Sequence, residues 1–262
     1  MSSNSALVPS QLASDPYEPE TQEDPNIVRR DYRFYSDHIV IQVENRLYKV
    51  PKRKFVDGSE VFRDMFALPT DSTTVEGQTD ERPIVLENIK KDEFQQLLHA
   101  MFTPLYGPSY EEQKEPTMED WISVLKLTAM WQFTKLRRVA IDKLTPLLKA
   151  ADIPVRWLGL ARQYDVHEWL FPALHALARR VQPIQLEEVE SLGIATVIKM
   201  AEVRESFVGW TRSPNDSFHA HVPTVRLQYD FTTIIRRVFQ DELKDSWVTD
   251  LISRRRTIWD SQ

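Results

Sequence analysis

The chain has 262 residues, with 42% hydrophobic and 27% charged side chains, which is the composition of an ordinary globular protein. It has no cysteine, which excludes disulfides, thiolate nucleophiles, Cys-ligated zinc and iron–sulfur clusters. Its 6 glycines argue against a phosphate-binding loop, and its net charge of −6 argues against nucleic-acid binding by the whole protein.

Residues 1–30 combine recurrent prolines with Ser, Asp and Glu, which predicts a disordered tail. The first residues lack the basic start and apolar run of a secretory signal. No stretch approaches the roughly 18 consecutive apolar residues of a membrane span. We therefore expect an intracellular protein, cytoplasmic or nuclear, without a membrane partner.

A strand-like alternation of apolar and polar residues covers 39–44, and a second short strand is predicted at 47–50. Asn45-Arg46 is the expected hairpin turn between them. Pro83 to Leu86 has the composition of a third short strand, with its proline at the first position. The loop from Pro69 to Arg82 that precedes it is polar and contains Gly77.

Ser59 is placed to cap a short helix that ends at Leu68. This helix carries an apolar set, for which core packing is the favoured interpretation. A partner-binding surface is the alternative. The set consists of Phe62, Met65, Phe66 and Leu68.

The rest of the chain is predicted to be helical. Thr117 and Asp120 form a capping-box pattern at the start of a helix that ends near Met130, after a loop at 103–116. Helical spacing of apolar residues predicts further helices at 92–102, 135–148, 154–164, 168–181, 186–192 and 195–208. A loop at 209–225 and helices from Tyr229 complete the chain, with a break near Asp245-Ser246.

Strands followed by helices indicate an α+β domain with an all-helical extension. The expected organisation is a tail at 1–30, an α+β domain at 31–149, a helical extension at 150–208, and a loop with C-terminal helices at 209–262.

The order of strand, strand, helix, loop, strand and helices resembles the BTB/POZ domain. The residues at 36–43 resemble the family's opening strand with its characteristic Asp37. The residues at 59–66 resemble its S-x-x-F-x-x-M-F helix, and Pro83 with Phe94 resembles its third strand and next helix. A narrower resemblance, to the BTB proteins abundant in mushroom-forming fungi, rests on several patterns that include Trp121 and Trp131.

This resemblance implies a protein–protein interaction module, a scaffold or adaptor, with no catalytic activity, no cofactor and no small-molecule substrate. It leaves the protein partner unknown. Two departures modify the implication. The tail offers no amphipathic helix for a strand-swapped dimer, so a monomer or weak dimer is expected. The stretch between Phe66 and Pro83 lacks a copy of the family's cullin-binding motif. A transcription-associated or ubiquitin-ligase substrate adaptor stays open as the alternative.

A metal-dependent hydrolase is a third, less favoured interpretation. His167-Glu168 begins like a metalloprotease helix, but Phe171 occupies the place of the second ligand, so a helix start is favoured. His219 and His221 lack an obvious third ligand. Glutamates cluster on one predicted helix, where a solvated face is favoured over paired catalytic carboxylates. These are Glu187, Glu188 and Glu190.

Basic clusters occur at Arg236-Arg237 and Arg254-Arg255-Arg256, with a weaker one at Lys52-Arg53-Lys54. A nuclear-import signal or a phosphate-contacting surface is one interpretation. A solvated helix face is the favoured one, supported at Arg254-Arg255-Arg256 by the stabilisation of cations near the C-terminus of a helix.

Overall fold

A computed structural model describes residues 30–31, 35, 37–68, 76–106, 115–211 and 226–244. The chain divides into two compact units, Met1–Ser36 and Asp37–Gln262. In the first unit, the main-chain N–H of Tyr35 donates to the carbonyl of Asp31 over 2.7 Å. The predicted disordered tail lies outside the described residues apart from Arg30.

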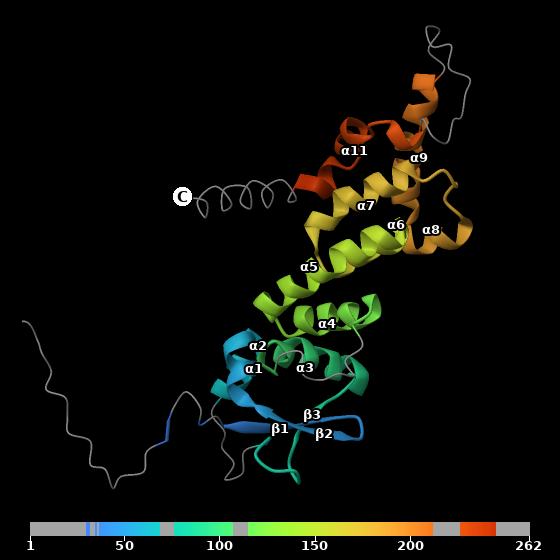
Figure 1. Cartoon of the computed structure of the whole chain (residues 1–262). Helices are drawn as coiled ribbons and strands as arrows, with labels where there is room; N and C mark the ends of the chain where they lie inside the picture. Colours follow the sequence, from blue (N-terminus) through green and yellow to red (C-terminus); the bar gives the residue numbers. More distant parts are fainter. Residues whose placement is uncertain are drawn as a thin grey trace, which may run out of the picture. The chain divides into compact units, whose positions relative to one another are not determined.

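The second unit is an α+β structure, mostly helical, with one small mixed sheet, as the sequence predicts at that level. The strand order is β2-β1-β3 (Figure 1). Strand β1 (His38–Val43) pairs antiparallel with β2 (Arg46–Pro51) and parallel with β3 (Ile84–Leu86). The hairpin turn is one residue earlier than predicted, at Glu44-Asn45, and Glu44 has a positive φ of 53°.

The two faces of β1 are covered differently. Ile39, Ile41 and Val43 point to one face and are buried in the core. Val40 points to the other face and is nevertheless 2% exposed. The loop before β3 protects it, because the N–H of Val40 donates to the carbonyl of Gly77 over 2.8 Å. Gly77 has a φ of +80°, a conformation that residues with a Cβ rarely adopt.

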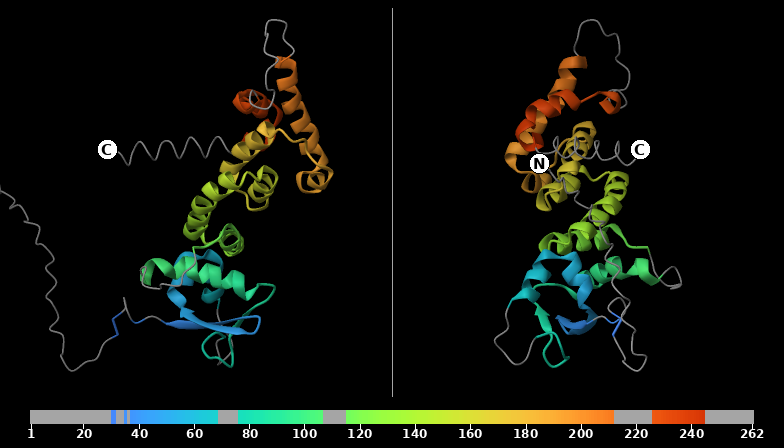
Figure 2. Two further views of the ribbon diagram at one scale, coloured as in Figure 1. Left: turned by 45° about the vertical axis from the view of Figure 1, so that its right-hand side comes forward. Right: turned by 90° about the vertical axis from the view of Figure 1, so that its left-hand side faces the viewer.

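Three helices lie on the core side of the sheet (Figures 1 and 2). They are α1 (Lys52–Gly58), α2 (Glu60–Ala67) and α3 (Lys91–Tyr106). The sequence did not predict α1, because its first turn is basic and Phe55 is its one buried residue. Helix α3 also continues to Tyr106, so the loop predicted from Thr103 was placed too early.

The remaining described elements are helices, as predicted. Helix α4 opens with the predicted capping box, in which the hydroxyl of Thr117 accepts from the N–H of Asp120 and the Asp120 carboxylate accepts from the N–H of Thr117. A turn at Phe239 ends the last labelled helix, and the predicted break at Asp245-Ser246 lies outside the described residues. These helices are α4 (Met118–Met130), α5 (Thr134–Ala151), α6 (Pro154–Gln163), α7 (His167–Arg179), α8 (Leu186–Leu192), α9 (Ile194–Thr211) and α11 (Thr232–Val238).

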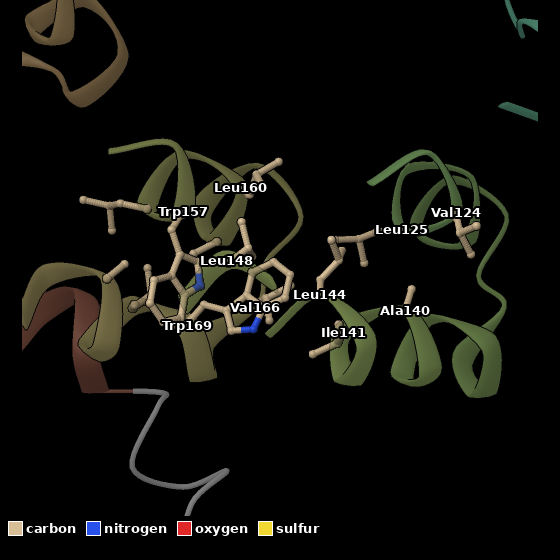
Figure 3. Packing of buried hydrophobic residues seen from close by; sticks show 14 of the residues in the cluster. Val124, Leu125, Ala140, Ile141, Leu144, Leu148, Trp157, Leu160, Val166 and Trp169 are labelled. Carbon is tan, nitrogen blue, oxygen red and sulfur yellow. The ribbon is translucent and has the colours of Figure 1, made fainter. Parts of the chain in front are cut away.

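One hydrophobic core runs from the sheet into these helices. Leucines of α4 and α5 and the tryptophans of α6 and α7 contribute to it (Figure 3). Trp169 is 1% exposed, and its Nε1 donates to the hydroxyl of Thr145 over 2.8 Å. The core is therefore continuous across residue 150, where the predicted extension begins.

Candidate partner-binding surface

Helix α2, which carries the predicted partner-binding residues, is held in place at its first residue. Ser59 is fully buried, and its hydroxyl accepts a hydrogen bond from the N–H of Phe62 over 3.1 Å. The same hydroxyl donates to the main-chain oxygen of Trp131 at the end of α4. One side chain therefore caps α2 and joins it to a helix distant in sequence.

Phe62 anchors α2 from below. It is 2% exposed, and its ring lies 5.0 Å from Phe55, 5.4 Å from Trp131 and 6.0 Å from Phe133, measured between centroids. The contacts with Phe55 and Trp131 are edge-to-face, a favoured arrangement of aromatic rings. Phe62 is therefore a core residue that supports the proposed surface and does not form it.

Apolar side chains next to Phe62 on α2 are exposed. Val61, Met65 and Leu68 are 37%, 36% and 69% exposed. Val61 and Met65, four residues apart, lie on one side of α2, and Leu68 follows the last residue of the helix in an extended conformation. Phe66 is half-buried, and the ammonium of Lys52 lies 4.4 Å from the centre of its ring. This α2 face, defined as Val61, Met65 and Leu68, is an apolar strip with charged neighbours.

The structure therefore divides the predicted set. Met65 and Leu68 are on the α2 face. Phe62, which is buried, and Phe66, which is half-buried, support it from beneath. Val61 belongs to the face although the predicted set omitted it. Its position four residues before Met65 is the signal that identifies it.

The signature residues named for the family resemblance occupy different environments. Asp37 is exposed, and its carbonyl accepts a hydrogen bond from the N–H of Lys52 over 2.8 Å. Pro83 and Trp121 are half-buried, and Trp121 packs against the core. Trp131 is 7% exposed and lies under α2. Trp131 is thus the signature residue that directly supports the α2 face.

Two of the candidate catalytic carboxylates, Glu168 and Glu188, form ion pairs, whereas Glu187 and Glu190 are exposed. The Glu168 carboxylate lies 2.6 Å from the guanidinium of Arg138. Glu188 accepts from both terminal nitrogens of Arg180 over 2.6 Å, which with its other contacts lowers its pKa to about 2. A catalytic acid needs a raised pKa, so Glu188 has the opposite property.

Within the described ranges, no three His, Cys, Asp or Glu side chains are grouped so that they could hold a metal ion. His167 lies 3.4 Å from the carboxylate of Asp165. His219 and His221 are outside the described residues.

The described basic clusters also have local contacts. Arg53 pairs with Asp57 at 3.1 Å within α1. The guanidinium of Arg236 lies 5.6 Å from the centre of the Phe171 ring, and Arg237 lies 3.1 Å from Glu202. The Arg254-Arg255-Arg256 cluster is outside the described residues.

Two half-buried arginines bind the C-terminal end of α7. Arg204 of α9 donates to the carbonyls of Leu177, Val181 and Gln182. Arg226 donates to the carbonyl of Ala178. Burial, with smaller contributions from neighbouring arginines, lowers the pKa of Arg204 to about 10. These guanidiniums satisfy carbonyls that a helix end leaves unpaired, so their role is structural.

No protein-family model matches this chain, and no curated protein matches it either. Among the described residues, no helix combines the length and the apolar character that crossing a bilayer requires.

Proposed function

We propose that this protein is a BTB/POZ-type interaction module of the kind abundant in mushroom-forming fungi, acting as a scaffold or adaptor without catalytic activity. The element order supports the proposal. Two strands, the helix capped by Ser59, the strand after Pro83 and the helix with Phe94 follow one another as in the resemblance, with α1 added before α2. Phe94 is fully buried under Trp131, with 6.1 Å between their ring centroids.

The observation that carries the functional proposal is the α2 face. Val61 and Met65 on α2 and Leu68 directly after it stay exposed, while Phe62 and Ser59 fix the helix on the core. A partner that covers them meets a preorganised surface, so little conformational entropy is lost on binding. Exposed apolar residues at helical spacing with charged neighbours are typical of a protein-binding site.

The ion pairs of the candidate catalytic residues also support a binding role. Glu168 and Glu188 are held by arginines and act as structural anions. The sequence favours a helix start at His167-Glu168 and a solvated face for Glu188, and the ion pairs instead give both carboxylates a role in helix packing.

The experiment is a comparison of partners captured by the intact protein and by two variants. Met65→Asp with Leu68→Asp places charge on the α2 face. Val139→Asp is the matched control, because Val139 is 42% exposed on α5. We expect the α2 variant to lose partners that the wild type and the control retain. Identical partner sets for all three proteins would contradict the proposal.

The identity of a partner lost in this way also separates the adaptor readings. A ubiquitin-ligase component or a transcription factor would support the corresponding alternative, and a structural protein would support the scaffold.

A further inference from the structure

Helix α9 has two apolar sides, of which one is exposed. Met200, Val203 and Phe207 form the buried side. On the other side, Ile194 is 70% and Ile198 is 65% exposed. A helix that is apolar on both sides is normally buried between neighbours. The exposed side of α9 therefore resembles a surface that another segment covers.

Acidic residues continue this side toward the end of α9. The α9 face is formed, at helical spacing, by Ile194, Ile198, Ala201 and Glu205. Glu202 lies beside it and meets Arg237 in a contact whose side chains are 57% and 71% exposed. Such exposed pairs contribute little. Glu205 forms no ion pair with another residue in the described part of the chain. The α9 face is thus apolar at one end and acidic at the other.

The last described residues of the chain lie beside α9. Helix α11 packs on it, and the ammonium of Lys199 is 5.5 Å from the centre of the Phe239 ring. The pKa of Asp241 is lowered, mainly by Lys244 and to a smaller extent by Lys199. The chain therefore passes close to Lys199, the neighbour of Ile198, shortly before position 245.

The sequence that follows Lys244 is complementary to the α9 face. Leu251 is four positions after Trp247, and Arg254-Arg255-Arg256 comes next. Apolar residues thus precede charged ones in both segments, and the charges are opposite. The seven residues from Asp245 to Leu251 reach at most about 25 Å when extended.

We propose that residues 245–262 of the same chain dock on the α9 face. Trp247 and Leu251 cover Ile194 and Ile198, and the arginine cluster faces Glu202 and Glu205. A tethered segment meets its site at an effective concentration in the millimolar range, which favours docking within one chain. This docking is independent of the role proposed for the α2 face.

The absence of cysteine from the chain allows a direct test in the full-length protein. Ala201→Cys places a single thiol in the middle of the α9 face, and Val139→Cys places one on α5 as the control. Alkylation rates are measured with the native C-terminal segment and with Trp247→Asp combined with Leu251→Asp.

We expect the Asp substitutions to speed alkylation at position 201 about tenfold, because a site covered nine-tenths of the time is open for the remaining tenth. The rate at position 139 stays unchanged. Equal rates at position 201 with and without the substitutions would overturn the proposal. Protection that grows with protein concentration would overturn it as well, because it would assign the α9 face to a second copy.

Disulfide formation between two introduced cysteines provides a second test of the docking. Under mild oxidation, Ala201→Cys with Leu251→Cys is expected to give a crosslinked monomer, whereas Val139→Cys with Leu251→Cys is not. Equal crosslinking in the two variants, or crosslinked dimers alone, would contradict docking within one chain.

Discussion

The hydroxyl of Ser59 donates a hydrogen bond to the main-chain oxygen of Trp131, 72 residues further along the chain. Both groups are buried, and the same hydroxyl caps α2. This contact fixes the helix that presents Met65 and Leu68. The proposed surface therefore depends on a residue that is itself inaccessible to a partner.

Replacement of Ser59 tests this contact. Ser59→Ala removes the cap and leaves the buried carbonyl of Trp131 without its donor, so we expect a loss of about 1–3 kcal/mol in the free energy of unfolding. Ser123→Ala is the control, because the Ser123 hydroxyl bonds only to the carbonyl of Glu119 in its own helix. Urea unfolding measures both. Equal losses for the two variants would show that the contact has no special role.

The different burial of Phe62 and Met65 on α2 predicts unequal effects of truncation. Phe62→Ala opens a cavity among aromatic rings and is expected to cost about 3–5 kcal/mol. Met65→Ala changes an exposed side chain and is expected to cost about 0.5 kcal/mol. Thermal and urea unfolding of both variants provide the comparison. A larger loss for Met65→Ala would contradict the burial of Phe62 and the exposure of Met65.

Alanine substitutions at two glycines are expected to change stability in opposite directions. A Cβ at Gly77 would lie 2.8 Å from Cδ1 of Ile84, at a φ of +80°, whereas a Cβ at Gly159 in α6 meets nothing within 4 Å. Gly77→Ala is therefore expected to destabilise the protein by about 1–3 kcal/mol. Gly159→Ala is expected to stabilise it by up to about 1 kcal/mol. Stabilisation by both variants would contradict the described loop over Val40.

The ion pair between Glu188 and Arg180 predicts a dependence of stability on pH. The pKa of Glu188 is about 2 in the folded protein and 4.5 without these contacts. Because the folded value is the lower one, the stabilisation is complete above pH 4.5 and is lost as the pH falls toward 2. The difference corresponds to at most about 3 kcal/mol.

Glu188→Gln is expected to destabilise the protein at pH 7 and to have a smaller effect at pH 3, because below pH 4.5 the unfolded wild-type chain is stabilised by a proton that Glu188 does not bind in the folded protein. Urea unfolding at the two pH values measures the difference. Glu190→Gln, an exposed position on the same helix, is the control. A loss that is the same at both pH values would exclude the ion pair as its cause.

Local sequence signals predicted much of the fold. Thr117 with Asp120, Ser59, and the alternation at 39–44 each specify structure within a few residues, and the corresponding helix starts and strand are found. Helix α1 was missed because one apolar residue, Phe55, is too weak a periodic signal. The hairpin turn was displaced because Glu44, a residue with no strong preference for positive φ, adopts it.

The candidate site was only partly predictable, since burial on α2 depends on distant residues. Phe62 is covered by Trp131 and Phe133, whereas Met65, three residues later, is not. The sequence places both on one helix but does not specify which residues of α4 pack on them. The pairing of Glu188 with Arg180 depends in the same way on how the end of α7 meets α8.

The affinity of a captured partner for the intact protein and for Met65→Ala tests the central claim most directly. If the α2 face is the binding site, Met65→Ala weakens binding by at least about tenfold, or about 1.4 kcal/mol, while Val139→Ala leaves the dissociation constant unchanged. Dissociation constants that agree for the wild type, Met65→Ala and Val139→Ala would contradict the assignment of the α2 face as the partner-binding surface.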